Sequence, residues 1–423
     1  MNKHAFAVAA LIASIAFPVR AQQGPKATDF PPPKPAFPGQ TGAPAPKKAS
    51  TVTVETVVAR MSSPWSMAFL PDGKILIAER NGTMRTARMD GVYSGPIAGV
   101  PDVKVVAAQS LHDIALDPNF AKNRLIYFSY FAPPPGEDPA VWPNSFFYDK
   151  VVSKPLAERR TMNVGTERVA RARLSEDDKR LENVQVILDG VERRLAFAPD
   201  GTLYATGADR FRFYENDTDG LEHEVTDPDV LRNFTGRVAR INPDGSIPKD
   251  NPFLGQPTVL PETFSYGHRD PEGAAINPAT GELWLDEHGP LGGDEINIIR
   301  AGKNYGWPNV SYGRQYSGVP VGKGASAKEG TEQPIYFWYP DIGPSGMMFY
   351  TGDLFPEWKG NVFVGALYGK FLVRLVLDGE HVVAEEHLLV DLGQRVRDVR
   401  QGPDGAVYVL TDAGNLLRLT PKK

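Results

Sequence analysis

The sequence predicts an all-β protein, a six-bladed β-propeller, and three observations support this prediction. A pattern of apolar residues, a Pro-Asp-Gly-like turn and an alternating strand recurs six times over about 370 residues, or roughly 60 residues per copy. Amphipathic segments with a helical period are almost absent. The 41 Gly and 38 Pro suit turn-rich β structure. Four-stranded units at this period are typical of propellers, whereas an array of β-sandwiches, the alternative, rarely has repeats this similar.

The six copies are recognised by their turns. Asp-Gly or Asn-Gly between β-rich segments indicates a hairpin, because Gly accepts the positive φ that tight turns need. The turns are Pro71-Asp72-Gly73, Asp117-Pro118-Asn119, Pro199-Asp200-Gly201, Asn277–Gly281, Pro403-Asp404-Gly405 and a weaker one at Pro356–Gly360. A β-branched strand at Thr51–Val58 is expected to pair with the last strand, Asn415–Thr420, and so to close the ring.

Two segments precede the predicted propeller, which spans residues 51–423. Residues 1–21 have a basic start, an apolar stretch and a small-x-small ending at Ala21, the parts of a signal peptide. Residues 22–50 are rich in Pro, Ala and Lys and are predicted to form a disordered linker. We therefore expect a periplasmic or secreted protein without a membrane span after cleavage; an uncleaved anchor is the alternative.

Composition excludes several function classes. The absence of Cys removes disulfides, thiolate nucleophiles and zinc–sulfur sites. With 46 Lys and Arg against 51 Asp and Glu, the chain lacks the basic excess that nucleic-acid binding requires. A small-molecule ligand at the mouth of the central channel is the function class that the predicted fold suggests.

Polar residues that do not fit strand alternation gather in a few segments. The longest, Ser265–Pro308, combines His, Arg and many acids with Gly residues that let the backbone approach a ligand or an ion. Arg395 and Arg397 are two residues apart on a predicted strand and so share a face, which suits a ligand with carboxylates or phosphates; a solvated edge is the alternative. An insertion at Pro133–Thr161 is either a border of the binding site or a surface excursion.

Two further positions are candidates for proton chemistry. His112 next to Asp113 would be a base with an orienting carboxylate, although adjacent side chains usually diverge. Asp209 would either orient a base or cap a turn.

These segments resemble the signatures of the soluble glucose/sorbosone dehydrogenase family, the PQQ-dependent aldose sugar dehydrogenases. The resemblance covers roughly Thr51–Leu419 and is most specific in Tyr266–Pro308 and in Arg395-Val396-Arg397-Asp398-Val399. It implies a six-bladed propeller that transfers a hydride from sugar C1 to pyrroloquinoline quinone (PQQ), with Ca²⁺ and a periplasmic electron acceptor.

The resemblance also implies site residues, position by position. The cofactor-binding positions are Gln109, Arg269, Asp270, Lys370, Arg395 and Arg397. The backbone carbonyls of Gly289 and Pro290 would bind the Ca²⁺ that holds PQQ, and Asp294, Glu295 and Tyr305 match positions that bind a structural Ca²⁺. Arg269 would also polarise the quinone oxygen, and Asp209 stands where the family orients its catalytic His.

The sequence departs from the family pattern at that catalytic His. Its position is Gly190, and Gly cannot take a proton, so His112 and Glu192 are the replacement bases that the sequence offers. Asp270 and Glu272 stand where the family has neutral amides, and both acids would repel a trianionic cofactor.

Three functions therefore stay open. The first, which we favour, is a PQQ-dependent sugar dehydrogenase with an atypical base. The second is an enzyme of another class, a metal- or acid–base-assisted lyase or hydrolase, at the same channel mouth. The third is a non-catalytic propeller that binds a sugar or a quinone.

Overall fold

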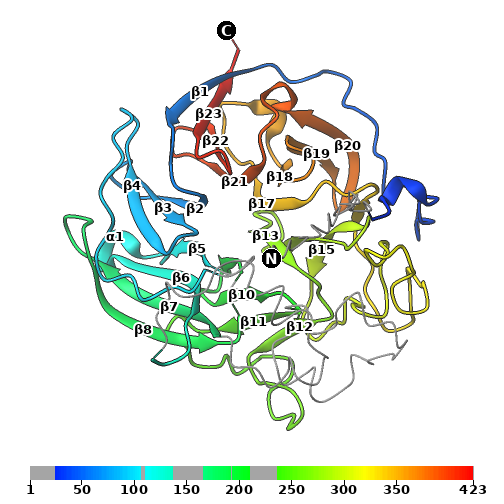
Figure 1. Cartoon of the computed structure of the whole chain (residues 1–423), viewed down its shortest axis with the longest axis horizontal. Helices are drawn as coiled ribbons and strands as arrows, with labels where there is room; N and C mark the ends of the chain where they lie inside the picture. The colour runs from blue at the N-terminus through cyan, green and yellow to red at the C-terminus, as the bar shows by residue number, and fades with distance from the viewer. Residues whose placement is uncertain (1–23, 106–109, 137–164, 192, 210–235, 423) are drawn as a thin grey trace, which may run out of the picture.

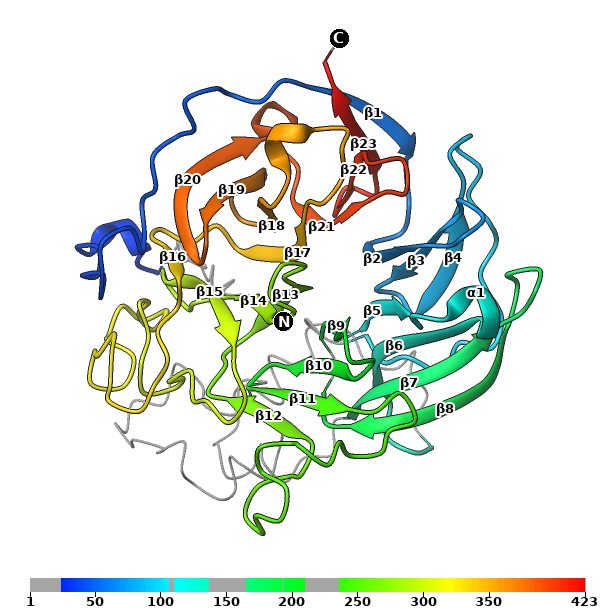
Figure 2. The ribbon, with the colours of Figure 1, turned by 180° about the vertical axis from the view of Figure 1, so that it is seen from behind.

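The computed structural model of the chain is a six-bladed β-propeller, as the sequence predicts. It describes residues 24–105, 110–136, 165–191, 193–209 and 236–422. Figure 1 and Figure 2 show the blades arranged in a ring around a central axis.

Each blade is an antiparallel sheet that starts with its innermost strand. The first blade, three-stranded within the described residues, has β2 (Pro64–Phe69), β3 (Ile75–Glu79) and β4 (Thr83–Ala87). The second has β5 (Leu111–Leu116), the short helix α1 (Phe120–Asn123), β6 (Leu125–Ala132), β7 (Thr166–Leu174) and β8 (Leu181–Asp189). The third has β9 (Leu195–Phe197), β10 (Leu203–Gly207), β11 (Arg237–Ile241) and β12 (Thr263–Tyr266).

The other three blades follow the same order. The fourth has β13 (Pro271–Ile276), β14 (Leu283–Glu287), β15 (Asp294–Ile299) and β16 (Tyr336–Trp338). The fifth has β17 (Pro344–Phe349), β18 (Val362–Ala366), β19 (Leu372–Asp378) and β20 (His381–Leu388). The sixth has β21 (Val396–Gln401), β22 (Val407–Thr411), β23 (Leu416–Pro421) and, from the other end of the chain, β1 (Val52–Val58).

The ring closes as predicted. Strand β1 pairs antiparallel with β23, with Val54 opposite Leu419, so the two ends of the propeller complete one blade. Each predicted turn lies between the first and second strands of its blade. Gly73 and Gly405 have φ of 85° and 77°, a conformation that L side chains rarely adopt, which is why these turns require Gly.

Apolar residues from the two faces of each sheet form the core between neighbouring blades. One cluster joins the first and second blades through Leu76, Ile126 and Phe128, and another joins the fourth and fifth through Trp284 and Val364. The innermost strands β2, β5, β9, β13, β17 and β21 contact one another around the axis. Residues at the start of these strands, and in the loops that precede them, therefore meet at the channel mouth.

The structure differs from the sequence prediction for residues 24–50, which we call the N-terminal arm. Figure 1 shows the arm, in blue, running outside the fifth blade to β1. It includes a 3₁₀ turn, Ala27–Asp29, and the side chain of Gln40 is fully buried, with Nε2 donating to the Pro334 carbonyl at 2.8 Å and Oε1 accepting from the Tyr312 hydroxyl at 3.0 Å. The composition predicted a disordered linker because it does not reveal these distant partners.

The predicted signal peptide and most of the Pro133–Thr161 insertion lie outside the described residues. In the described part of the chain, no helix has the length and apolar character needed to cross a membrane.

Candidate functional site

Buried ion pairs tie the innermost strands together below the channel mouth. The guanidinium of Arg194 lies 3.4 Å from Asp113 of β5 and 3.2 Å from Asp398 of β21, and all three side chains are at most 1% exposed. Arg194 also lies over the ring of Trp65 at 4.0 Å. This cluster joins four blades, so its role is to fix the positions of the strands that carry the site.

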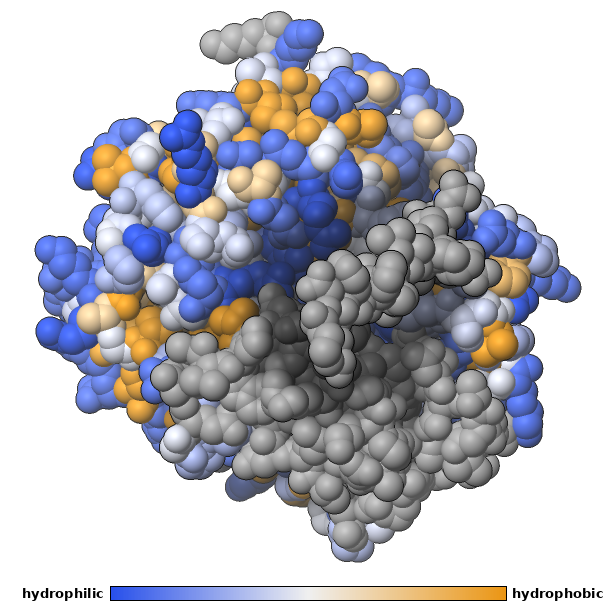
Figure 3. Space-filling view, viewed as in Figure 1, coloured by the Kyte–Doolittle hydropathy of each residue, from blue (hydrophilic) through white to orange (hydrophobic). Residues whose placement is uncertain are grey.

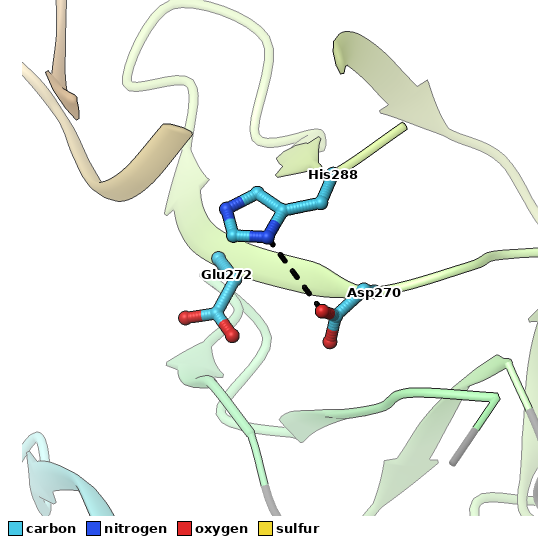
Figure 4. A group of neighbouring side chains, drawn as sticks. All are labelled: Asp270, Glu272 and His288. Carbon is cyan, nitrogen blue, oxygen red and sulfur yellow. Dashed lines mark ion pairs between the residues drawn. The ribbon is translucent and has the colours of Figure 1, made fainter. Parts of the chain in front are cut away.

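Asp270, Glu272 and His288 form a group at the start and end of the first hairpin of the fourth blade (Figure 4). Their potential ligand atoms all lie within 4.8 Å of one another. His288 Nε2 donates to the Pro344 carbonyl at 2.7 Å, since a carbonyl oxygen only accepts. Nδ1 is then the free ring nitrogen, and it lies 3.6 Å from an oxygen of Asp270.

Arg193, at the entrance to the third blade, faces both of the acids that replace amides. Its guanidinium lies 3.3 Å from Asp270 and 3.6 Å from Glu272, and Arg397 contacts the other oxygen of Glu272 at 3.6 Å. Burial by itself would raise the pKa of Glu272, but the charges of Arg193, His288 and Arg397 lower this pKa to about 2. Glu272 is therefore ionised, and its charge is compensated within the protein.

Arg269 is held at the site by two neighbours. Its guanidinium donates to the His288 carbonyl at 2.9 Å and lies 5.4 Å from the centre of the Trp307 ring. The indole N–H of Trp307 in turn donates to the carboxylate of Asp209 at 2.6 Å. Asp209, predicted to orient a base or cap a turn, thus orients the ring beneath Arg269.

Arg395 and Arg397 share one carboxylate at the start of β21. Asp412 accepts from Arg395 at 2.7 Å and from Arg397 at 2.9 Å, so the two side chains lie on the same side of the strand. Burial raises the pKa of Asp412, but the two arginines outweigh this effect and lower it below its usual value. Arg397 is 7% exposed and Arg395 is 45% exposed, which leaves Arg395 accessible to a ligand.

The predicted structural-calcium residues divide into two roles. Asp294 accepts backbone N–H bonds from Gly289, Ile342 and Gly343 at 2.7–2.9 Å, so it fixes the loop that carries the Gly289 and Pro290 carbonyls. Glu295 and Tyr305 instead line a cavity of about 20 Å³.

This small cavity is also lined by Glu287 and Arg269, and its two carboxylates, Glu287 and Glu295, give it the chemistry of a cation site. Burial first, and then the charges of Glu287 and Asp294, raise the pKa of Glu295 well above its usual value. Calcium prefers carboxylate and carbonyl oxygens, and the volume suffices for a single ion or water. The residues present therefore fit Ca²⁺.

A larger cavity of about 440 Å³ opens at the channel mouth. It is lined by His288, Gly289, Pro290 and Arg395, and on another side by residues 25–28 of the N-terminal arm. Figure 3 shows a hollow near the centre of this face with a largely hydrophilic visible rim. The volume is that of a typical small-molecule site.

Not every predicted site residue reaches this cavity. His112 is fully buried against the Trp65 ring, with Nε2 3.4 Å from the Arg193 guanidinium, and it is not among the described residues that line the cavity. Lys370 is exposed at a turn, with φ of 61°, and is not among the described residues that line the cavity. Arg269, Asp270 and Arg397 are not among them either. Gln109 and Glu192 lie outside the described residues.

Sequence reasoning missed Arg193, Trp307 as the partner of Asp209, and Glu287. The two consecutive arginines, Arg193 and Arg194, could have indicated that one of them has a role at the site. Only Arg194 is needed for the buried cluster with Asp113 and Asp398, which leaves Arg193 for another contact. Trp307 and Glu287 lie in the polar segment Ser265–Pro308, but their individual contacts could not be predicted, because these contacts join residues far apart in the chain.

The fold and the site define a class: a six-bladed propeller whose channel mouth combines arginines with carboxylate oxygens of the kind that divalent cations prefer. The chain belongs to the glucose/sorbosone dehydrogenase family, whose model matches residues 61–418. Members of this family are sugar dehydrogenases, that is, oxidoreductases.

Three relatives place the chain within the family. It is 37% identical over 388 residues to the aldose sugar dehydrogenase YliI of Escherichia coli, a match that covers 88% of this chain and 94% of the relative. It is 26% identical over 437 residues to quinoprotein glucose dehydrogenase B of Acinetobacter calcoaceticus, with 87% of each covered. A crystal structure of a glucose dehydrogenase superposes with a TM-score of 0.74 at 38% identity, over 88% of this chain and 99% of that one.

Proposed function

We propose that this protein is a PQQ- and Ca²⁺-dependent dehydrogenase of an aldose sugar or a related alcohol or aldehyde. The observation that carries the proposal is the 440 Å³ cavity, which brings the Gly289–Pro290 loop and Arg395 together at the channel mouth. The fold and the quinoprotein relative support the same cofactor.

The charges of the site fit a tricarboxylate such as PQQ. Within the group at the channel mouth, four arginines (Arg193, Arg269, Arg395 and Arg397) outnumber by one the three carboxylates of the same group (Asp270, Glu272 and Asp412), and of these side chains Arg395 lines the 440 Å³ cavity. The Gly289 and Pro290 carbonyls would provide oxygen ligands for Ca²⁺. The two acids that replace amides therefore weaken the positive field without reversing it.

In the proposed mechanism, bound PQQ would supply the hydride acceptor. Arg269, held by the His288 carbonyl and Trp307, would bind the quinone side, and Arg395 and Arg397 the carboxylates. We assign the base to His288: its side chain lines the cavity, and because Nε2 donates to the Pro344 carbonyl, Nδ1 is the ring nitrogen that would take the substrate hydroxyl proton. Asp270, 3.6 Å away, then stabilises the protonated ring.

The first experiment is a titration of metal-stripped protein with PQQ, with and without Ca²⁺, followed by dye-linked oxidation of a panel of aldoses. Calcium-dependent binding with turnover supports the proposal, and His288→Gln should then lower kcat about 10²-fold or more with little change in PQQ affinity. No PQQ binding would overturn it. Gly190→His is a weaker test, because φ of 89° at Gly190 strains any L side chain.

A second candidate function rests on the group formed by Asp270, Glu272 and His288. Its ligand atoms lie close enough to hold a divalent metal, and the bond from Nε2 to the Pro344 carbonyl is the kind of contact that orients a metal-ligating His. This arrangement favours a metal-assisted lyase or hydrolase. Binding of Mn²⁺ or Zn²⁺ without PQQ binding, lost in His288→Gln, would select it.

The predicted signal peptide adds a location to the proposal. Cleavage after Ala21 would release the protein into the periplasm or the medium, where a soluble electron acceptor would reoxidise the cofactor. Fractionation of cells, with the mature N-terminus sequenced, tests this part independently of activity.

A further inference from the structure

We infer that the N-terminal arm is part of the ligand site: residues 25–28 form one wall of the 440 Å³ cavity, and Lys26 binds a carboxylate of the ligand. The inference deepens the proposed function and rests on it for the identity of the ligand. It concerns a segment that lies before the family match, which begins at residue 61.

The arm is fixed against the body of the propeller. Ala27 is 5% exposed, and its carbonyl accepts the hydroxyl of Tyr339 at 2.6 Å. The guanidinium of Arg314 lies 4.6 Å from the centre of the Phe30 ring. The backbone N–H of Lys26 donates to Asp29 at 2.8 Å, which stabilises the turn. These contacts, at Ala27 within residues 25–28 and at Phe30 just after them, hold this wall in place.

The arm lines the same cavity as the expected cofactor contacts. Residues 25–28 line it together with His288, Gly289, Pro290 and Arg395. Tyr316 and Tyr368 also line it and are 52% and 71% exposed, so aromatic faces are available to a sugar or a planar ring. A ligand held by the Gly289–Pro290 loop would therefore have the arm as its neighbour.

The charges that face the cavity favour an anion. Its two acidic residues are turned toward the backbone: Asp294 accepts three backbone N–H bonds, and Asp341 accepts one from Gly292 at 2.5 Å. Lys26 and Arg395 are the cationic side chains among the described residues that line it. A carboxylate is the matching ligand group, and it belongs either to PQQ or to an acidic sugar such as a uronate.

The test compares Lys26→Gln with Lys34→Gln, an exposed lysine of the same arm that does not line the described part of the cavity. Calorimetry measures the affinity for PQQ with Ca²⁺, for glucuronate and for glucose. We expect Lys26→Gln to weaken binding of a carboxylate ligand about three- to fivefold, the upper end for an exposed ion pair, with glucose and Lys34→Gln unaffected.

The pattern of losses identifies the source of the carboxylate. A loss for PQQ alone assigns Lys26 to the cofactor, and a loss for glucuronate alone assigns it to the substrate. Equal affinities in wild type and Lys26→Gln for both ligands overturn the inference. If wild type binds glucuronate but no PQQ, the proposed function fails, while the glucuronate comparison still tests the arm; binding of neither ligand overturns both.

A second variant tests the wall without relying on charge. Thr28 is exposed and lines the cavity, so Thr28→Trp should fill part of it while leaving the Ala27 and Phe30 anchors intact. We expect at least a tenfold loss of ligand affinity with an unchanged melting midpoint. Unchanged affinity would show that the arm does not bound the ligand.

Discussion

Arg193→Met tests whether the acids Asp270 and Glu272 are held in the site by one internal cation. Arg193 is 5% exposed and lies 3.3 Å and 3.6 Å from the two carboxylates. At an effective dielectric constant near 20, each contact is worth about 5 kcal/mol of Coulomb energy, which the desolvation of the guanidinium partly offsets. Since removing one partner of a buried pair typically costs about 3–5 kcal/mol, we expect a loss of this size in the free energy of unfolding.

Urea unfolding of the cofactor-free protein measures this loss, and two variants control it. Arg180→Met removes an exposed ion pair with Glu182 and should leave the unfolding midpoint unchanged. In the triple variant Arg193→Met/Asp270→Asn/Glu272→Gln, all three charges are gone, so most of the stability should return. If Arg193→Met unfolds at the wild-type midpoint, the three side chains do not form a coupled group and the reasoning fails.

Three further predictions concern buried groups at the site. Trp307→Phe removes the donor to Asp209, so it should cost about 1–3 kcal/mol in urea unfolding, with Asp209→Asn, which keeps an acceptor, costing less. Burial, together with the neighbouring charge of Asp294, raises the pKa of Asp341 to about 8, so the folded protein holds a proton that the unfolded chain releases near pH 4. The stability of the fold should therefore fall as the pH rises from 4 to 8. In melting curves recorded without added Ca²⁺, Asp341→Asn should make this dependence on pH weaker. A calcium chelator should lower the melting midpoint of wild type but not of Glu295→Gln, whereas equal chelator shifts in both would place the ion elsewhere.

The fold was predictable because its signals are local. Each blade begins with a hairpin whose turn is written in consecutive residues, as at Pro199-Asp200-Gly201, and repetition of that signal gave the number of blades. The shared face of Arg395 and Arg397 was also predictable, since it depends only on the two-residue period of a strand.

The rest depends on contacts that join distant parts of the chain. Gln40 finds its carbonyl partner 294 residues away, so the composition of the arm could not predict that it would be ordered. His112 was a reasonable base beside Asp113, but its side chain is fully buried, in contact with the Trp65 ring and the Arg193 guanidinium. Which of several histidines reaches a cavity is decided by packing, and no pattern in the sequence records it.

Contacts between distant parts of the chain also change how the departures from the family pattern at positions 190, 270 and 272 should be interpreted. Considered singly, Asp270 and Glu272 add two negative charges to a site for a trianion, and Gly190 removes its base. In the structure, Arg193 cancels one of those charges, and Asp270 lies beside the free nitrogen of His288 at the cavity. In the proposed mechanism, Asp270 would therefore act as the partner of a base at His288, although on its own it opposes binding of an anionic cofactor. Asp270 and Glu272 also share Arg193, which is why reverting either acid alone to an amide should disrupt this group.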